Sequence, residues 1–391
     1  MDHPLLILAD DLTGAADTAS RCCAAGLPAT IFLTPPHPPL PAGVVAFTSD
    51  SRHLPPEEAA RRVREVAAPL ADIKAIWYKK IDSTLRGNIG SEVDALLGLL
   101  DAPATLVCPA FPAQGRGLVN GHLVAPGSPP VGVHLPSLLR EQSRYPVEAF
   151  SLQDVRSGAL AERFQRRDAK ARRRKEDNER VILVVDGLTE EDLGLIVEAA
   201  ESIPGLLLCG SAGLIGEVAK RGNRTDLPGF RKPGRSEGRT LVVVGSGSPM
   251  AHRQIEGLLA AYPAAARFAI DLDRSAHPVP DDAPLVLIHQ PPPLSDAVLD
   301  GPEARRRANL LADATLAQIA QNQPDLLLLV GGDTAVAVLS RLGVERLSVQ
   351  AELLPGMPLC AAEVNGRRLG VVMKPGSFGD ENALASLLRI A

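Results

Sequence analysis

The sequence predicts an α/β protein of two α/β domains, each with a mainly parallel sheet flanked by helices. Short β-type apolar runs recur along the chain, a loop of small residues follows each run, and a segment of helical period comes next. This order is typical of βα units, in which a helix connects two parallel strands. The length of 391 residues fits two or three domains.

The N-terminal half begins with one such unit: a strand over residues 5–8, a loop over residues 10–14 and a helix that ends near residue 25. The other strands predicted in this half cover residues 44–48, 75–78, 105–108, 181–185 and 206–208. The other predicted helices cover residues 56–71, 89–100 and 190–202. These elements predict an N-terminal α/β domain.

A stretch rich in Gly, Pro, Arg and Lys follows, with little apolar periodicity over residues 221–239, as is typical of a linker. We therefore expect an N-terminal domain over residues 1–225, a linker over 226–239 and a C-terminal domain over 240–391. The strands predicted in the C-terminal domain cover residues 240–244, 267–270, 285–288, 326–330, 358–362 and 369–373, and a helix is predicted over 335–342.

Two segments are expected to lie outside the sheets. Residues 35–41 contain five prolines, which cannot donate the backbone hydrogen bonds of a sheet, so they are expected to form an extended surface loop. Residues 163–180 are dense in charges of both signs. A polyanion site is the alternative for that segment, but the interleaved acids favour a solvated helix.

Composition argues against several classes of protein. A net charge of -5 and only twelve aromatic residues (8 Phe, 3 Tyr and 1 Trp) do not favour nucleic-acid binding. No apolar run approaches the roughly 20 residues of a membrane-spanning helix, so no membrane partner is expected. The five cysteines form no CxxC pair, which favours a reducing cytoplasm and disfavours structural zinc.

Polar residues follow the first predicted strand. Asp10, Asp11 and Thr13 stand where ligands bind in open α/β sheets, outside the carboxyl ends of strands. Their oxygens could bind Mg²⁺, receive a proton or hold substrate hydroxyls. The structural alternative is that Asp11 or Thr13 only caps the next helix.

A second cluster follows the predicted strand that ends at residue 78. Arginine can grip a carboxylate through two parallel hydrogen bonds, and lysine adds a mobile charge, so the cluster favours an anionic substrate. Its candidate substrate-binding residues are Lys79, Lys80, Asp82, Ser83 and Arg86. The alternative is a surface loop with a helix cap at Ser83 or Thr84. Gln114 and Asn120, in the loop after residue 108, are weaker candidates.

Three glycine-containing loops follow strands of the C-terminal domain. Glycines let backbone N–H groups point into one concavity, and a helix N-terminus adds positive potential. Phosphate is therefore the expected ligand. Tight packing is the alternative at each single loop. The candidate nucleotide-binding residues are Ser246, Ser248, Gly331, Gly332, Asp333, Thr334, Gly376 and Ser377.

Familiar nucleotide motifs are missing from the sequence. Met250 stands where the third glycine of a dinucleotide fingerprint would be, and no GxxxxGK[ST] motif occurs. His252 is expected on a helix surface rather than as a base.

Taken together, the motifs resemble those of the four-carbon acid sugar kinases, and the resemblance runs from end to end. They occur in the order seen in that family: ADDLTGAAD (9–17), KKIDSTLRGNIGSE (79–92), CPAFPAQGR (108–116), NG (120–121), CGSAGL (209–214), GSGS (245–248), GGDTA (331–335) and KPGSFGDENAL (374–384). Two positions differ from the usual family pattern, Gly247 and Ser377.

The resemblance implies an N-terminal substrate domain and a C-terminal ATP domain with the active site in the cleft between them. It also implies transfer of the γ-phosphoryl group to a hydroxyl of a threonate-, erythronate- or 3-oxo-tetronate-type acid. ATP would be held by the three glycine-containing loops, and Mg²⁺ by the phosphates with Asp333. A non-catalytic sensor, a nicotinamide oxidoreductase and a sugar-acid isomerase or aldolase without ATP are the alternatives. The assembly stays open, with a homodimer as one option.

Phosphoryl transfer needs alignment and charge neutralisation more than covalent chemistry. As catalytic residues we therefore expect Arg86 with Lys79 or Lys80 to grip the substrate carboxylate and the moving phosphoryl group. Asp10, Asp11 or Asp82 would orient the hydroxyl and take its proton late, because an ordinary aspartate, with a pKa near 3.9, is a weak base.

Overall fold

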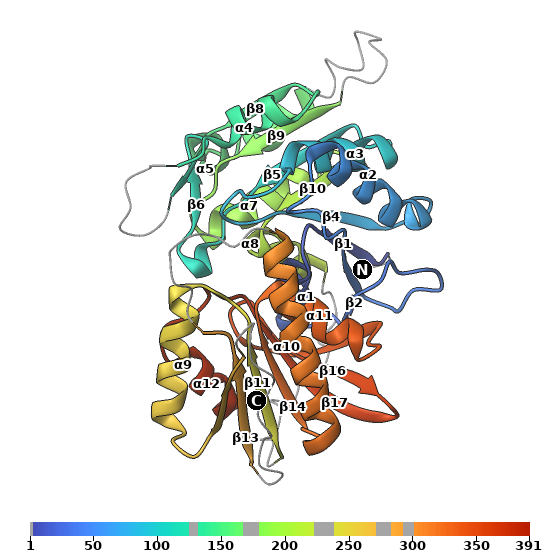
Figure 1. The fold of residues 1–391 in the computed structure, drawn as a ribbon. Coiled ribbons are helices and arrows are strands. Elements are labelled where there is room, and N and C mark those ends of the chain that lie inside the picture. Colours follow the sequence, from blue (N-terminus) through green and yellow to red (C-terminus); the bar gives the residue numbers. More distant parts are fainter. Residues whose placement is uncertain (1–2, 125–131, 167–179, 223–237, 271–282, 292–300) are drawn as a thin grey trace. The chain divides into compact units, whose positions relative to one another are not determined.

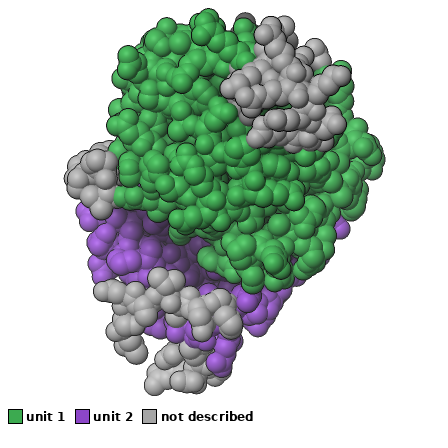
Figure 2. Space-filling view, turned by 90° about the horizontal axis from the view of Figure 1, so that it is seen from above, with its two compact units in different colours: residues 1–29, 35–228 green, residues 30–34, 229–391 purple. Residues whose placement is uncertain are grey.

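The structure is a computed structural model that describes residues 3–124, 132–166, 180–222, 238–270, 283–291 and 301–391. The chain forms two compact units, drawn as a ribbon in Figure 1 and coloured separately in Figure 2. The N-terminal unit takes residues 1–29 and 35–228, and the C-terminal unit takes residues 30–34 and 229–391. Residues 226–237 of the expected linker and 167–179 of the expected charged helix lie outside the described residues.

The N-terminal unit contains a parallel sheet with apolar strands, as expected for a sheet buried on both faces. Its strands are β1 (Leu5–Ala9), β3 (Val44–Thr48), β4 (Ile76–Lys80), β5 (Ala104–Cys108), β8 (Val147–Phe150), β9 (Val181–Val185) and β10 (Leu207–Gly210). Their order is β3-β1-β4-β10-β5-β9-β8, and each neighbouring pair is parallel. A separate hairpin pairs β6 (Gly117–Val119) with β7 (His122–Val124).

The helices of this unit are α1 (Leu12–Ala24), α2 (Pro56–Ala67), α3 (Ile89–Leu99), α4 (Leu135–Gln142), α5 (Leu152–Arg156), α7 (Glu190–Ala200) and α8 (Ala212–Gly222). α1, α7 and α8 contact one another in series, as do α2, α3 and α4, and Figure 1 shows strands between these two groups. The expected loop over residues 35–41 is confirmed as irregular chain. The prediction of a mixed α/β fold with mainly parallel strands is confirmed.

The C-terminal unit combines parallel and antiparallel strands. They are β2 (Ala29–Phe32), β11 (Thr240–Val244), β12 (Ala266–Ala269), β13 (Leu285–His289), β14 (Leu326–Val330), β15 (Arg346–Leu354), β16 (Met357–Val364) and β17 (Arg367–Lys374). β12-β13-β11-β14-β17 are parallel, and β17-β16-β15-β2 continue antiparallel. β2 was not predicted, and its pairing places residues 30–34 in this unit although they lie early in the chain.

The helices of the C-terminal unit are α9 (Pro249–Ala261), α10 (Gly301–Asn322), α11 (Gly332–Arg341) and α12 (Ala383–Ile390). α9 and α12 pack together and cover one face of the sheet, where the buried cluster includes Val242, Leu328 and Val372 from the strands and Ile255 and Leu387 from the helices. Among the described helices, none is both long and apolar enough to cross a membrane.

Register places the polar loops of each unit at one edge of its sheet. Ala9 of β1 pairs with Thr48 of β3 and with Lys80 of β4, so the loops after these three strands begin at the same level. In the C-terminal unit, Val330 of β14 pairs with Val244 of β11 and Lys374 of β17. The three glycine-containing loops therefore begin at one level as well.

Candidate active site

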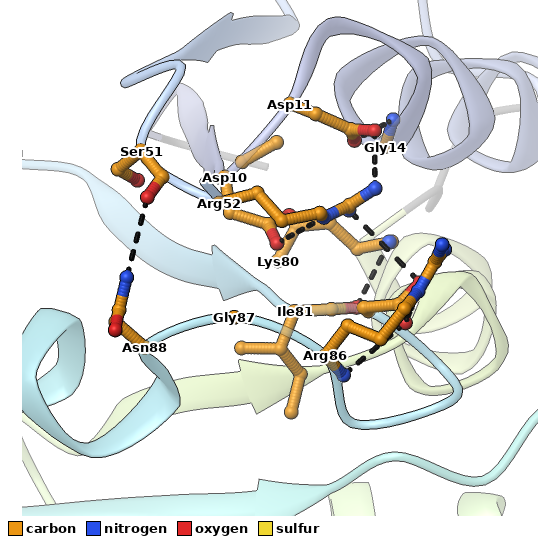
Figure 3. Close-up of polar contacts among 12 residues, drawn as sticks. Asp10, Asp11, Gly14, Ser51, Arg52, Lys80, Ile81, Arg86, Gly87 and Asn88 are labelled. Carbon is orange, nitrogen blue, oxygen red and sulfur yellow. Dashed lines mark hydrogen bonds and ion pairs between the residues drawn. The ribbon is translucent and has the colours of Figure 1, made fainter. Parts of the chain in front are cut away.

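Arg52 lies at the centre of the polar edge of the N-terminal unit, among Asp10, Asp11 and Lys80 (Figure 3). Its Nε and Nη2 atoms each donate to one oxygen of Asp10 at 2.8 Å, and its Nη1 atom donates to Asp11 Oδ2 at 2.5 Å. Nη2 also lies 4.0 Å from Asp82 Oδ1. One guanidinium therefore joins carboxylates from the loops after β1 and β4.

Asp11 both caps a helix and belongs to this cluster. Its Oδ1 atom accepts from the backbone N–H of Gly14 at 2.7 Å, which makes Asp11 the N-cap of α1. Its Oδ2 atom accepts from the Thr13 hydroxyl at 2.7 Å and from Arg52. A Cβ at Gly14 would lie 2.8 Å from Asp11 Oδ1 and 3.2 Å from Lys80 Nζ, so glycine keeps this close approach open. The capping alternative thus holds for Asp11, whose second oxygen still faces Arg52.

The loop after β4 folds around Asp82. Arg86 donates to both carboxylate oxygens of Asp82, from Nε at 2.7 Å and from Nη2 at 3.1 Å, and the Thr84 hydroxyl also donates to Asp82. The Arg86 side chain is 64% exposed whereas that of Asp82 is 10% exposed, so a ligand can reach the guanidinium. The helix-cap alternative for Ser83 or Thr84 is wrong, because α3 begins after Asn88.

The two lysines of β4 have different surroundings. Lys79 is fully buried, and its ammonium lies 2.7 Å from Glu92 Oε2 on α3. The Ser51 hydroxyl donates to the other oxygen of Glu92 at 2.8 Å. Lys80 lies beside α1, near Gly14, and donates to the carbonyl of Ile81 at 2.9 Å. Lys79 therefore stabilises the site from within, and Lys80 is the better placed of the two for a ligand.

The surrounding cations keep the carboxylates ionised. Burial by itself would raise the pKa of Asp10, but the charges of Arg52, Lys79 and Lys80 outweigh it and lower that pKa below its ordinary value. Burial likewise opposes ionisation of Asp82, whose pKa is nevertheless well below its ordinary value because Arg86 and Arg52 stabilise the anion. Both carboxylates are anionic near neutral pH, where they can accept hydrogen bonds from hydroxyl groups but are weak bases.

The loop after β5 meets the loop after β4 through Arg116. Its Nη1 atom donates to Ser83 Oγ at 2.6 Å and to Gln114 Oε1 at 3.2 Å, so the predicted residues Ser83 and Gln114 share one partner. Asn120 lies in the hairpin, and its backbone N–H donates to Asp186, just after β9, at 2.6 Å. The hairpin is thus anchored three places along the sheet from β4.

In the C-terminal unit, the loops after β11 and β17 touch. Ser248 caps α9, and its hydroxyl donates to the carbonyl of Gly376 at 3.1 Å. A Cβ at Gly376 would lie 1.9 Å from Ser246 Oγ, so a larger residue would push these loops apart. Ser377, the next residue, is exposed.

The loop after β14 completes this edge. Gly331 has a φ of 110°, in the region that favours glycine, and it begins α11 without a side-chain cap. The first N–H groups of α11, from Gly332 and Asp333, therefore remain available for an anion. Thr334 is buried and packs so closely on Gly245 that a Cβ there would lie 1.9 Å from its Oγ1 atom. Asp333 is exposed beside them.

These donors fit a triphosphate with its cation. Uncapped N–H groups and glycine loops suit phosphate oxygens, and one exposed carboxylate suffices for Mg²⁺ when phosphates and water supply its other ligands. Within the described ranges, no three His, Cys, Asp or Glu side chains cluster as a protein-only metal site.

The α/β fold and the comparisons with known proteins together identify the class of this protein as a phosphotransferase. A family model for a sugar-binding N-terminal domain matches residues 5–218, and one for a nucleotide-binding C-terminal domain matches residues 241–384. The chain belongs to the four-carbon acid sugar kinase family.

Two kinases of four-carbon acids match nearly the whole chain, and a third matches two thirds of it. A D-threonate kinase of Salmonella typhimurium is 30% identical over 98% of this chain and 97% of its own. A 3-oxo-tetronate kinase of Burkholderia multivorans is 29% identical over 99% of this chain and 97% of its own. A D-erythronate kinase of Heliobacterium modesticaldum is 34% identical over 66% of this chain and 61% of its own.

Solved structures share the fold. A Salmonella typhimurium LT2 protein has a TM-score of 0.73 at 23% identity and covers 99% of both chains. The Haemophilus influenzae protein HI1011 has a TM-score of 0.70 at 24% identity, covering 97% of this chain and 98% of its own.

Proposed function

We propose that this protein uses ATP and Mg²⁺ to phosphorylate a hydroxyl of a four-carbon sugar acid of the threonate, erythronate or 3-oxo-tetronate type. The observation that carries the proposal is the cluster around Arg52, in which ionised carboxylates lie beside the exposed guanidinium of Arg86. Such a site offers one group for the carboxylate of a small acid and others for its hydroxyls. The similar kinases named above support the substrate class.

Arg86 binds the substrate carboxylate, and Lys80 adds positive charge beside it. Arg86 already forms two hydrogen bonds with Asp82, so substrate binding exchanges or shares them. Asp10 and Asp82 hold the hydroxyls of the acid in a fixed orientation, since their lowered pKa values keep them as hydrogen-bond acceptors. The acceptor hydroxyl loses its proton late, when phosphoryl transfer has made it acidic enough for an ionised aspartate, Asp10 or Asp82, to accept that proton.

In the C-terminal unit, the nucleotide is held at the edge where β11, β14 and β17 end. ATP supplies the phosphoryl group, and Mg²⁺ neutralises part of its charge. Backbone N–H groups of residues 331–334 and 376–377 bind phosphate oxygens, with the hydroxyls of Ser246 and Ser248 close by, and Asp333 holds Mg²⁺. A cleft shared by the two ligands stays a prediction, as does a homodimer. We place the protein in the cytoplasm because its five cysteines are free and buried.

The test measures ADP formation with Mg-ATP and each of several four-carbon acids. At least one acid should raise ADP formation far above the rate with ATP alone, and a phosphorylated acid should appear in equal amount. Modification of an acid without ATP would contradict the proposal. So would nucleotide and acid binding, seen as thermal stabilisation, without any turnover, because that result would indicate a sensor.

A further inference from the structure

Lys374, the last residue of β17, is a buried cation at the edge assigned to the nucleotide. Its side chain is fully buried, and among the described residues it forms no ion pair. Its Nζ atom donates to the backbone carbonyls of Pro375 at 2.9 Å and Gly376 at 3.3 Å. Burial without a neighbouring anion lowers the pKa of Lys374 to about 7. A lysine in this position is expected to gain a counter-charge from a ligand.

One of these two carbonyls, that of Gly376, accepts hydrogen bonds from two different loops. Gly376 O also accepts from the hydroxyl of Ser248, the residue that caps α9. Pro375 O in turn accepts from the N–H of Phe378 at 3.2 Å. The ammonium therefore fixes the turn of residues 375–378 against the loop after β11.

Gln254 of α9 anchors the rest of this turn. It is fully buried, and its Nε2 atom lies 3.0 Å from the carbonyl of Phe378 and 2.7 Å from that of Asp380. A Cβ at Gly257, one helical turn further on, would lie 2.5 Å from Glu381 O, so α9 follows the same segment closely. Lys374 and Gln254 thus hold residues 375–380 from both ends.

We propose that Lys374 and Gln254 are positioning residues for the triphosphate: they fix residues 375–380 against the Gly245–Ser248 loop, and the uncompensated charge of Lys374 lies behind that turn to balance the phosphates. This inference rests on the proposed ATP-dependent function and adds residues to its nucleotide site. The carbonyls of Pro375 and Gly376 accept from the ammonium and the N–H of Phe378 is used within the turn, so the N–H groups of Gly376 and Ser377 are the ones proposed to bind phosphate oxygens. Neither residue is expected to affect binding of the acid.

The experiment compares Lys374→Met with Arg368→Met in the full-length protein. Both changes remove a cation from β17, but the Arg368 side chain is exposed, and among the described residues it donates to Gln350 alone. Mg-ATP affinity is measured by calorimetry, stability by thermal unfolding without ligands, and KM for the acid by ADP formation. Gln254→Met serves as a second variant that keeps the size of the side chain but removes its donor.

Lys374→Met should weaken Mg-ATP binding about 10- to 100-fold, the loss expected for a charge-assisted interaction, with KM for the acid unchanged. Its stability without ligand should equal or exceed that of the wild type at pH 8, because Lys374 keeps its proton at that pH in the unfolded chain and loses it on burial, which destabilises the folded wild type. Gln254→Met should weaken Mg-ATP binding in the same direction. Arg368→Met should leave all three quantities unchanged.

Two results would overturn the inference. In the first, Lys374→Met binds Mg-ATP as tightly as the wild type, which would show that the lysine does not contribute to triphosphate binding. The other is a loss of stability in Lys374→Met together with equal losses for ATP and the acid, which would indicate a purely structural lysine. If the wild type itself binds no Mg-ATP, the proposed function fails, and this is distinguishable from failure of the inference alone.

Discussion

Replacement of Arg52 by Met should destabilise the N-terminal unit strongly. The Arg52 side chain is 9% exposed and that of Asp10 is 4% exposed, and the pair shares two hydrogen bonds of 2.8 Å. Removing one partner of such a pair leaves an uncompensated buried charge, which costs about 3–5 kcal/mol of unfolding free energy. The same change at Arg61, whose side chain is 56% exposed and paired with Glu65 on α2, should cost less than about 1 kcal/mol.

The pH dependence gives this prediction a second readout. In the wild type the lowered pKa of Asp10 stabilises the folded state above the ordinary pKa near 3.8, and this contribution disappears as the pH falls through the folded-state value. Without Arg52, burial should raise the pKa of Asp10 above its unfolded value. The variant should then gain stability relative to the wild type as the pH falls from 7 toward 4.

Urea unfolding at several pH values measures the free energy of unfolding and the coupling between Arg52 and Asp10. The proteins compared are the wild type, Arg52→Met, Asp10→Asn and the double variant. The double variant should be more stable than Arg52→Met at pH 7, because the orphaned charge is gone. Equal losses from Arg52→Met and Arg61→Met, or no recovery in the double variant, would refute the assigned role of the buried pair.

Three further outcomes are expected. Arg86→Ala should raise KM for the acid about 10- to 100-fold while Mg-ATP affinity is unchanged, because its exposed guanidinium is assigned to the substrate carboxylate; kinetics against both substrates check this. Gly376→Ala should weaken Mg-ATP binding measured by calorimetry, because the added Cβ would lie 1.9 Å from Ser246 Oγ; unchanged affinity would remove this loop from the site. Unfolding free energy of the wild type should rise relative to Lys374→Met between pH 7 and 10, by at most about 1.4 kcal/mol per pH unit, since the unfolded chain binds more protons than a folded lysine with a pKa of about 7.

Sequence was sufficient to locate most of the parallel strands and the polar groups at their ends, although β8 was not predicted. Apolar runs such as residues 44–48 and 326–330 became strands with unchanged bounds, because burial on both faces leaves a continuous apolar signal. Asp10 and Asp82 could be assigned to one edge because carboxyl ends of parallel strands meet there. Their roles in substrate binding stay predictions.

Other parts of the site depend on contacts that no local pattern encodes. Arg52 was missed although it closely follows β3, and the strand-end rule that selected Asp10 would have selected it too. Glu92 reads as an ordinary helix residue, and only the fold places it 2.7 Å from Lys79. β15 was also missed, although buried Leu347 and Val349 alternate with exposed Arg346 and Ser348, the pattern of a half-buried strand.

β2 has a consequence for any attempt to prepare the C-terminal unit by itself. Residues 30–32 form hydrogen bonds with residues 346–348 of β15, so a fragment starting near residue 229 would lack this neighbour. β15 would then be an exposed edge strand with unpaired backbone N–H and C=O groups. Such an edge can pair with other molecules, which is a common route to aggregation. A fragment that retains residues 29–34 through a fused linker should be the better-behaved preparation.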